Sequence, residues 1–411
     1  MSTLITNISK LLHIEDQGRK YKRGHELSHF PITQNAWLKI DNKKISAFGS
    51  MQNCPTDADE IIDAKGGMVY PGYVDSHTHL VYAATREEEF AMKLKGMSYE
   101  QIAAAGGGIL NSVKKLRNTT EDELYASAER RLIELIKLGT TAIEIKSGYG
   151  LDTASEMKML RVAQRLSENH PIRIKKTFLG AHAVPPEFSG ERTRFVEHIV
   201  NDMLPQIAAE NLCDYVDVFC EKGYFTVDDT LKIIQAATAH GLKCKLHVNQ
   251  FNILGIIEKA VVEGVLSVDH LEVLSDDEAK ILGKSETIAT LLPGCSFYTE
   301  IPYGPARKLI EQNAIIALAS DYNPGSAPSG NLSLALSLAC VKMKMTPEEA
   351  LSALTLNGAA ALELSDEMGS IEIGKTANLI ITRPHISPAF IPYNFGHNCI
   401  DKVLLNGVIY E

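Results

Sequence analysis

The sequence predicts an α/β protein: a (β/α)8 barrel of the TIM type with a small composite β-sandwich domain built from both chain ends. Three observations support this prediction. Eight short apolar runs alternate with helical patterns between about residues 68 and 365. Polar residues gather where those runs end, which is the face of a barrel that carries active sites. The two flanks read as short strands and turns.

The eight apolar runs are expected to be the barrel strands. In order they are "GMVYPGYVDSH", "TTAIEIKSG", "IRIKKTFLGAH", "YVDVFCE", "KCKLHVNQ", "LSVDHLE", "ETIATLL" and "IIALASD". Helical periodicity follows at Glu121–Leu138, Thr153–Glu168 and Val227–His240. A doubly wound sheet is the alternative, but it requires a glycine-rich phosphate turn after the first strand, where this chain has His77 and His79.

The chain divides into three expected segments. Residues 1–67 form the first part of the small β-domain, residues 68–368 form the barrel, and residues 369–411 complete the β-domain. A chain of 411 residues is long enough for a large core and a smaller second domain.

Composition narrows the class of protein. The formal net charge is −10, without a basic stripe, which argues against nucleic acid or an anionic membrane as a partner. No apolar run approaches the roughly 18–20 residues that span a bilayer. The seven cysteines are scattered, with no C-x-x-C, as is typical of reduced thiols. We therefore expect a cytoplasmic protein that binds neither nucleic acid nor membrane. A small-molecule substrate and a second copy of the chain, in a homodimer, are the expected partners.

Histidines and aspartates stand at the ends of the predicted strands. His77 and His79 follow the first strand; the other members are His182, His247, Asp269, His270 and Asp321. Residues i and i+2 of a strand point to the same side, so His77 and His79 would project together. Each residue alone has an ordinary structural explanation. Together, at one converging face, imidazoles and a carboxylate suit Zn²⁺ or iron.

This arrangement resembles the amidohydrolase superfamily, in which an H-x-H pair, a fifth-strand histidine and an eighth-strand aspartate bind metal. Members hold one or two metal ions. A second ion would need a ligand from the fourth strand, where Glu221 and Lys222 must be considered. We interpret this pair as a solvated loop start, which favours one ion.

Longer motifs extend the resemblance through the barrel. They are "DSHTHLVYAATREEEF", "AGGGIL", "EIKSGYGLD", "TFLGAHAVPPEF", "VDVFCE", "VDHLE", "LLPG" and "SDYNPGS". In this order they resemble the imidazolonepropionase family of histidine degradation. The resemblance implies hydrolysis of the cyclic amide of 4-imidazolone-5-propanoate to N-formimidoyl-L-glutamate, the third step of that pathway, without an organic cofactor.

The resemblance also implies roles for individual residues. One Zn²⁺ or Fe³⁺ per subunit would be bound by His77, His79, His247 and Asp321. Asp321 and His270 would be catalytic. The substrate contacts would be Arg86, Tyr149, His182, Gln250, Asn323, Gly325 and Ser326.

Two of these positions need separate interpretation. Arg86 can recognise the substrate carboxylate with its planar fork, although an arginine here could instead form a surface ion pair with Glu87, Glu88 or Glu89. The family often has an acidic pair where this chain has Asn249 and Gln250. An amide cannot act as a general base, but Gln250 can exchange hydrogen bonds with an imidazolone ring.

Three other functions fit parts of this pattern. An aromatic deaminase of the same fold would keep the metal ligands without needing a carboxylate clamp at Arg86. A non-catalytic metal-binding paralogue is suggested only by Gln250, and intact His270 and Asp321 speak against it. A purely structural barrel with scattered histidines would bind no stoichiometric metal.

Overall fold

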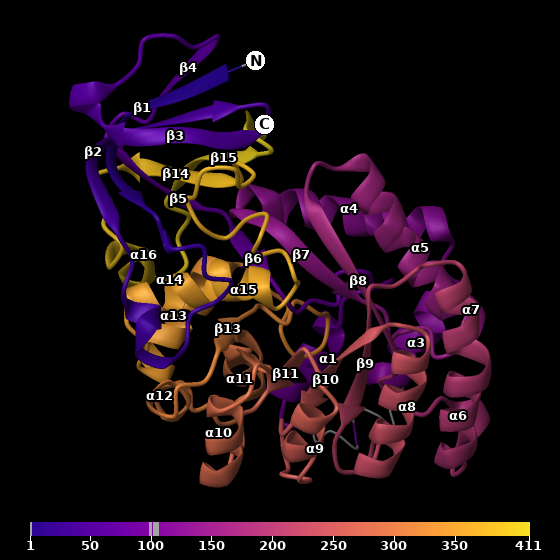
Figure 1. Cartoon of the computed structure of the whole chain (residues 1–411). Helices are drawn as coiled ribbons and strands as arrows, with labels where there is room; N and C mark the ends of the chain where they lie inside the picture. The colour runs from indigo at the N-terminus through magenta and orange to yellow at the C-terminus, as the bar shows by residue number, and fades with distance from the viewer. Residues whose placement is uncertain (1, 98–100, 102–106) are drawn as a thin grey trace.

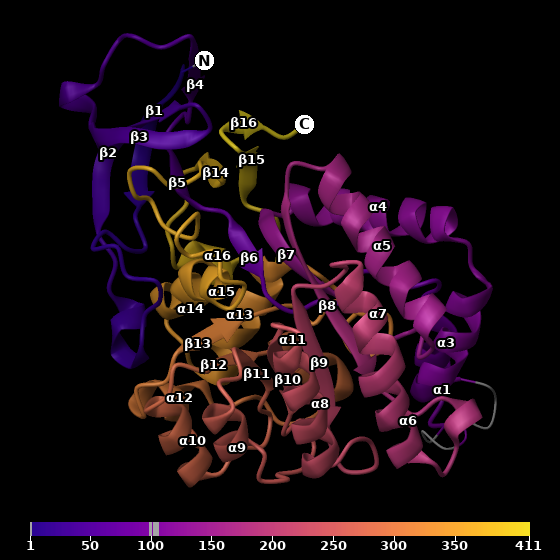
Figure 2. The same cartoon turned by 45° about the vertical axis from the view of Figure 1, so that its right-hand side comes forward.

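The computed structural model describes residues 2–97, 101 and 107–411, so residues 105 and 106 of the "AGGGIL" motif lie outside the described residues. Eight parallel strands form the barrel predicted from the sequence (Figures 1 and 2). They are β6 (Tyr73–Asp75), β7 (Thr140–Lys146), β8 (Arg173–Ala181), β9 (Tyr215–Cys220), β10 (Lys243–Val248), β11 (Ser267–His270), β12 (Ile288–Leu291) and β13 (Ile316–Leu318).

The barrel closes just beyond β6 and β13. Thr78 and Tyr322 form a parallel bridge. The amide of His79 donates to the carbonyl of Tyr322 at 2.9 Å, and the amide of Asp321 donates to the carbonyl of His77 at 3.1 Å. We call residues 75–79 and 320–322 the closure seam. Since both segments carry predicted metal ligands, closing the barrel also brings those ligands together.

Helices surround the barrel. They are α1 (Glu87–Leu94), α3 (Ile109–Asn118), α4 (Glu121–Lys137), α5 (Thr153–Asn169), α6 (Arg192–His198), α7 (Leu204–Ala209), α8 (Val227–Ala239), α9 (Ile257–Val262), α10 (Asp276–Gly283), α11 (Pro293–Thr299), α12 (Ala306–Glu311), α13 (Leu332–Met343), α14 (Pro347–Leu354), α15 (Leu356–Ala360) and α16 (Phe390–Tyr393). The three helices predicted by periodicity are α4, α5 and α8. Thr120 and Thr226 begin α4 and α8 with capping boxes, which explains why these helices start where they do.

A second sheet contains both chain ends (Figure 1). Its strands are β1 (Ser2–Leu12), β2 (Ile32–Asp41), β3 (Lys44–Ser50), β4 (Glu60–Asp63), β5 (Gly67–Pro71), β14 (Leu379–Pro384), β15 (Ile400–Leu405) and β16 (Val408–Ile409). The order is β16-β15-β14-β5-β1-β2-β3, with β4 also paired to β1. The antiparallel pair of β5 and β14 therefore joins the two ends of the chain, as the sequence predicts for a composite domain.

The first predicted strand is two strands in the structure. β5 pairs with β1 and β14 in the small sheet, whereas β6 pairs with β7 in the barrel. The chain passes from one sheet to the other at Gly72, so the small sheet extends past the expected boundary at residue 67. The three-segment division itself stays a prediction. Among the residues that the structure describes, no helix is long and apolar enough to cross a membrane.

Gly72 provides a test of this junction. Gly72→Ala should lower the free energy of unfolding by about 1–3 kcal/mol, because the added methyl would lie 2.1 Å from Thr141 Cγ2 in a buried position. Chemical denaturation measures the loss. The double variant Gly72→Ala/Thr141→Gly lacks the interfering atoms. Its loss of unfolding free energy should be smaller than the sum of the losses of the two single variants. Unchanged stability of Gly72→Ala would contradict this close approach.

Candidate metal centre and active site

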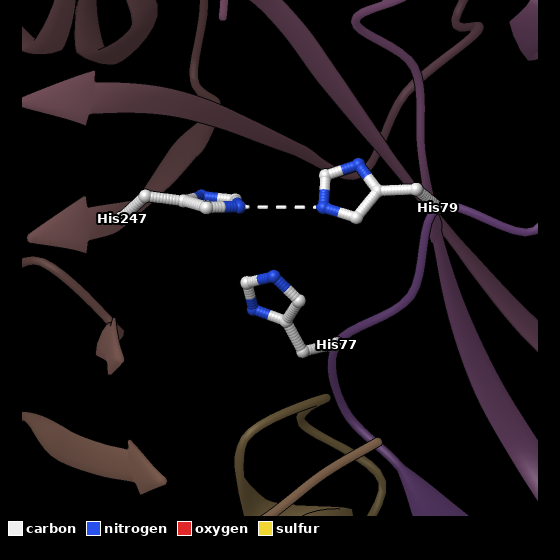
Figure 3. Close-up of side chains that lie close together, drawn as sticks. All are labelled: His77, His79 and His247. Carbon is white, nitrogen blue, oxygen red and sulfur yellow. Dashed lines mark hydrogen bonds between the residues drawn. The ribbon is translucent and has the colours of Figure 1, made fainter. Parts of the chain in front are cut away.

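Three histidine rings converge at the carboxyl end of the barrel (Figure 3). His77 and His79 lie in the closure seam directly after β6, and His247 lies near the end of β10. Asp321 approaches from the other side of the seam. All four side chains are buried, with exposed fractions of 3% or less. The four predicted metal ligands are therefore together and shielded from bulk water.

The distances between their donor atoms fit a single metal ion. His79 Nε2 is 3.3 Å from His247 Nε2, and Asp321 Oδ1 lies 3.5 Å from His77 Nε2 and 3.6 Å from His79 Nε2. Ligand atoms bound tetrahedrally at about 2.0–2.1 Å lie about 3.4 Å apart. His77 Nε2 is buried and has no hydrogen-bond partner among the described residues. An unpaired buried nitrogen is costly, so the donor set fits an ion at its centre.

Buried aspartates orient two of these histidines. His77 Nδ1 donates to Asp269 Oδ2 at 2.7 Å, and His247 Nδ1 lies 2.9 Å from Asp217 Oδ2. These contacts leave the Nε2 atoms for the centre, as is usual for metal-binding histidines. Burial lowers the pKa of His77 and His79 well below the ordinary value, which favours the neutral form that binds metal.

His270 lies beside this centre at the end of β11. Its backbone has a φ of 87°, a conformation that non-glycine residues rarely adopt. Its Nδ1 atom is 3.2 Å from Glu272 Oε1, and Glu272 is buried. Burial alone would lower the pKa of His270, but the Glu272 carboxylate and Cys295 raise it well above the ordinary value. His270 is thus held by an acidic partner that the sequence gave no reason to select.

A cavity of about 430 Å³ opens above the centre. Every residue that the sequence predicts as a substrate contact lines it: Arg86, Tyr149, His182, Gln250, Asn323, Gly325 and Ser326. The same cavity is lined by His79, His247, His270 and Asp321, whereas His77 does not line it. A molecule in the cavity would therefore contact both the metal centre and the predicted substrate contacts.

Arg86 is fixed at the cavity wall. Its Nε atom donates to Ser112 Oγ at 3.0 Å, and a Cβ atom at Gly325 would lie only 2.6 Å from its Nη1 atom. Two of the neighbouring glutamates have other partners: Glu87 accepts from Thr85, and Glu89 accepts from the amide of Gly108. The guanidinium therefore faces the cavity rather than these side chains.

The "KSGYGLD" loop forms another wall. Glu156, which is buried, accepts from the amides of Gly148, Gly150 and Leu151 at 2.7–2.9 Å. Gly148 has a φ of 110°, and a Cβ atom there would lie 2.9 Å from His182 Nδ1. This close approach places Tyr149 in the cavity.

His182 joins the loop to the metal centre. Its Nδ1 atom donates to the carbonyl of Gly148 at 3.0 Å, and its ring stacks on His79 with centroids 5.4 Å apart. Burial lowers the pKa of His182 to about 3, so the ring is neutral and can accept a hydrogen bond at Nε2.

The "DYNPGS" turn is held by Asn323. The Oδ1 atom of Asn323 accepts from the amides of Gly325 and Ser326 at 2.8 and 2.7 Å, while its Nδ2 atom donates to the carbonyl of Asp321 and to Ser326 Oγ. Asn323 thus shapes the wall that contains Gly325 and Ser326.

The two amides after His247 face different surroundings. Gln250 lines the cavity and donates to Cys295 Sγ at 3.4 Å, whereas Asn249 is fully buried and donates to Glu278. Neither amide can act as a general base. Glu221, directly after β9, is buried, so the interpretation of it as solvated is wrong; its carboxylate accepts from the amides of Lys222, Phe251 and Asn252, whereas Lys222 is exposed. These contacts agree with a single metal ion.

Sequence reasoning missed the residues that hold the predicted ones in place. They are Ser112, Glu144, Lys146, Glu156, Asp217, Lys245, Glu272 and Cys295, together with Asp269, for which the sequence indicates no role. One signal was available: charges inside strands that must be buried, as in "AIEIKS", "VDVF" and "KCKLH". Ser112, Glu156 and Cys295 come from helices, where the sequence gives no comparable signal.

The closed barrel and this donor set define the class: a hydrolase of the metal-dependent amidohydrolase type. Consistent with this, the family model described as Amidohydrolase family matches residues 68–410. The solved structure of E. coli guanine deaminase has the same fold, with a TM-score of 0.75 and 14% identity over 100% of this chain and 99% of that one.

Full-length relatives are considerably more similar in sequence. A protein of Christiangramia forsetii named imidazolonepropionase is 51% identical over 408 residues, 99% of both chains. One of the same name from Flavobacterium johnsoniae is 51% identical over 410 residues, the whole of both chains. This chain therefore belongs to the amidohydrolase family, and the full-length relatives that it resembles are imidazolonepropionases.

Proposed function

We propose that this protein hydrolyses 4-imidazolone-5-propanoate to N-formimidoyl-L-glutamate, the third step of histidine degradation. The observation that carries the proposal is one cavity lined by His79, His247 and Asp321 of the metal centre together with the Arg86 guanidinium. The reaction needs both parts: a centre that activates water at the ring, and a cation for the propionate carboxylate. The name borne by relatives that are 51% identical over the full length supports the same substrate.

The metal centre would hold one Zn²⁺ or Fe³⁺ per subunit, with His77, His79, His247 and Asp321 as ligands. When bound, such an ion lowers the pKa of a coordinated water from 15.7 to about 7. The protein's own part is to keep His77 and His79 neutral through burial, and to align His77 and His247 through their contacts with Asp269 and Asp217.

The cavity walls would bind and orient the substrate. Arg86, braced by Ser112, binds the propionate through its fork. Tyr149, His182, Gln250 and Ser326 face the ring, while Asn323 and Gly325 shape the turn beside it. This position sets the ring carbonyl above the metal centre, so binding energy at the carboxylate fixes the reacting atoms.

Asp321 would move the proton, and His270 would stabilise the charge that develops. Water oxygen bonds to the ring carbonyl carbon, and the bond from that carbon to the ring nitrogen breaks. Asp321 accepts a proton from the attacking water and passes it to the departing nitrogen, so the balance is one water added and one ring opened. His270, held by Glu272, stabilises the negative charge that develops on the carbonyl oxygen.

A deaminase acting on an aromatic ring is the competing function. The fold is shared with guanine deaminase, but such a substrate carries no carboxylate for Arg86 to bind. A cytoplasmic location and a homodimer remain our expectations for the protein in the cell.

The direct test is an assay of the proposed reaction. 4-Imidazolone-5-propanoate is generated in place, and its ultraviolet absorbance is followed while formiminoglutamate is quantified. We expect equal loss of substrate and gain of product. Release of ammonia from a purine or triazine, without conversion of the imidazolone, would identify a deaminase instead.

The first prediction concerns metal content. The purified protein should contain about one zinc or iron ion per chain, and His77→Ala or His247→Ala should lose it, because each removes a buried donor. Elemental analysis measures the content. His198→Ala, on α6 and outside the cavity, is the matched control and should keep the metal. Metal-free protein with full activity would refute the proposed centre.

The second prediction concerns the carboxylate clamp. Arg86→Ala should raise KM strongly, since a charged hydrogen bond contributes about 1.5–3 kcal/mol. Arg86→Lys should restore little, because a point charge cannot reproduce the fork. Steady-state kinetics measures both variants, and Arg130→Ala, at an exposed position of α4, is the control. If kcat/KM of Arg86→Ala equals that of the wild type, the carboxylate is bound elsewhere.

The third prediction separates Gln250 from Asp321. Gln250→Ala should remain active and lose about 1–3 kcal/mol of transition-state binding, the cost of one hydrogen bond. Asp321→Asn should lose far more, since proton transfer alone is worth on the order of 10²–10⁴-fold. The loss of activity of His270→Ala should be closer to that of Asp321→Asn than to that of Gln250→Ala.

These variants must be compared at equal metal occupancy, because loss of a ligand would otherwise imitate loss of proton transfer. If Gln250→Ala keeps its metal and fold but is as inactive as Asp321→Asn, the assignment of the proton shuttle to Asp321 is wrong.

A further inference from the structure

Five charged side chains lie inside the barrel beneath the metal centre. We call them the buried charge cluster: Glu144 and Lys146 of β7, Asp217 of β9, Lys245 of β10 and Asp269 of β11. Each is no more than 1% exposed. Three carboxylates and two ammonium groups in one dry interior are unusual, since such positions in a barrel are normally filled by branched apolar residues.

Lys146 contacts most of this cluster. Its Nζ atom donates to Asp217 Oδ2 at 2.7 Å and to Glu144 Oε1 at 3.0 Å, and lies 3.7 Å from Asp269 Oδ2. Burial alone would lower the pKa of Lys146, yet the carboxylates of Asp217, Glu144 and Asp269 raise it above its ordinary value. The side chain is therefore a fixed cation among three acids.

The two aspartates beside Lys146 are the partners of the metal-binding histidines. Asp217 faces His247 Nδ1 at 2.9 Å, and Asp269 accepts from His77 Nδ1 at 2.7 Å. One ammonium group thus lies against both histidine–aspartate pairs, although His77 follows the first barrel strand and His247 lies in the fifth. Without that cation, two buried carboxylates would repel each other and lose their fixed positions.

Lys245 completes the arrangement from the other side. Its Nζ atom donates to Glu144 Oε2 at 2.6 Å and to the carbonyl of Ser76 at 2.8 Å, directly before His77. Glu144 therefore bridges the two lysines. Asp269 is also fixed by Ser267 Oγ, which donates to its Oδ1 atom at 2.6 Å. The cluster therefore contacts the metal centre at His77, His247 and the carbonyl of Ser76, and its remaining contacts include those that join its own members.

We infer that Lys146 is a positioning residue for the metal: it fixes Asp217 and Asp269 against His247 and His77 and thereby sets the affinity of the centre. The inference rests on the metal centre of the proposed function. A role in stability alone explains the buried charge cluster less well, because buried ion pairs add little net stability compared with apolar packing. The contacts of this lysine serve two ligands at once.

The test measures metal binding without substrate. Apo Lys146→Met is titrated with zinc against a chromophoric chelator, and the visible spectrum of the cobalt-loaded protein reports ligand geometry. We expect the dissociation constant to rise tenfold to a hundredfold, as for the loss of other partners of metal ligands, with an altered cobalt spectrum. Circular dichroism and the thermal midpoint of the apo protein check folding.

Lys22→Met is the matched control. Lys22 is also a fully buried lysine, but it donates to the carbonyls of Ile14 and His29 in the N-terminal segment. This variant should lose stability and keep wild-type zinc affinity. If Lys146→Met does not fold, Glu144→Gln replaces it, since it keeps the shape while weakening the hold on Lys146, and its zinc affinity should fall in the same direction.

The outcomes separate the two proposals. Wild-type zinc affinity and cobalt spectrum in a folded Lys146→Met or Glu144→Gln protein would overturn this inference and leave the proposed function intact. A loss of affinity no larger than that of Lys22→Met would also overturn it. A wild-type protein that binds metal but does not hydrolyse the imidazolone would instead overturn the proposed substrate and leave the role of Lys146 standing.

Discussion

Closure of the barrel at the seam is the constraint on which the site depends. Asp75 accepts from the amide and the hydroxyl of Ser320 at 3.0 and 2.6 Å, and the backbones beyond them exchange hydrogen bonds as far as Tyr322. The first and last barrel strands are far apart in the chain, and this pairing places His77 and His79 beside Asp321. Closure of the barrel thus assembles the candidate metal centre.

The sequence was a good guide wherever a single physical rule dominates. Apolar runs that alternate with helical patterns are a strong signal of buried parallel strands. All eight barrel strands lie within the predicted runs. The break at Gly72 was not predictable from hydrophobicity, because residues on both sides are apolar and buried. Which sheet each half joins depends on the distant strand β14, with which β5 pairs antiparallel.

The site was predictable to the extent that a residue's own chemistry identifies it. His77, His79, His247 and Asp321 stand out as ligands, and motif resemblance added Arg86 and His270. The supporting residues did not stand out, because their roles exist only through partners far away in the chain. Glu272 is an ordinary acidic residue until His270 is seen 3.2 Å away, and Ser112 is an ordinary helical serine until it receives Arg86.

The floor and the walls of the cavity are formed by two different kinds of structure. The floor is built on strand ends and fixed by fully buried ion pairs, whereas Arg86, Gln250 and Ser326 belong to segments that follow the strands. A rigid floor suits a metal centre, whose donors must hold a set geometry. Substrate choice then depends on the segments above it, which can differ without disturbing the barrel. The same fold at 14% identity occurs in a guanine deaminase, while here Arg86 stands at the wall, where the function we propose needs a cation for a carboxylate.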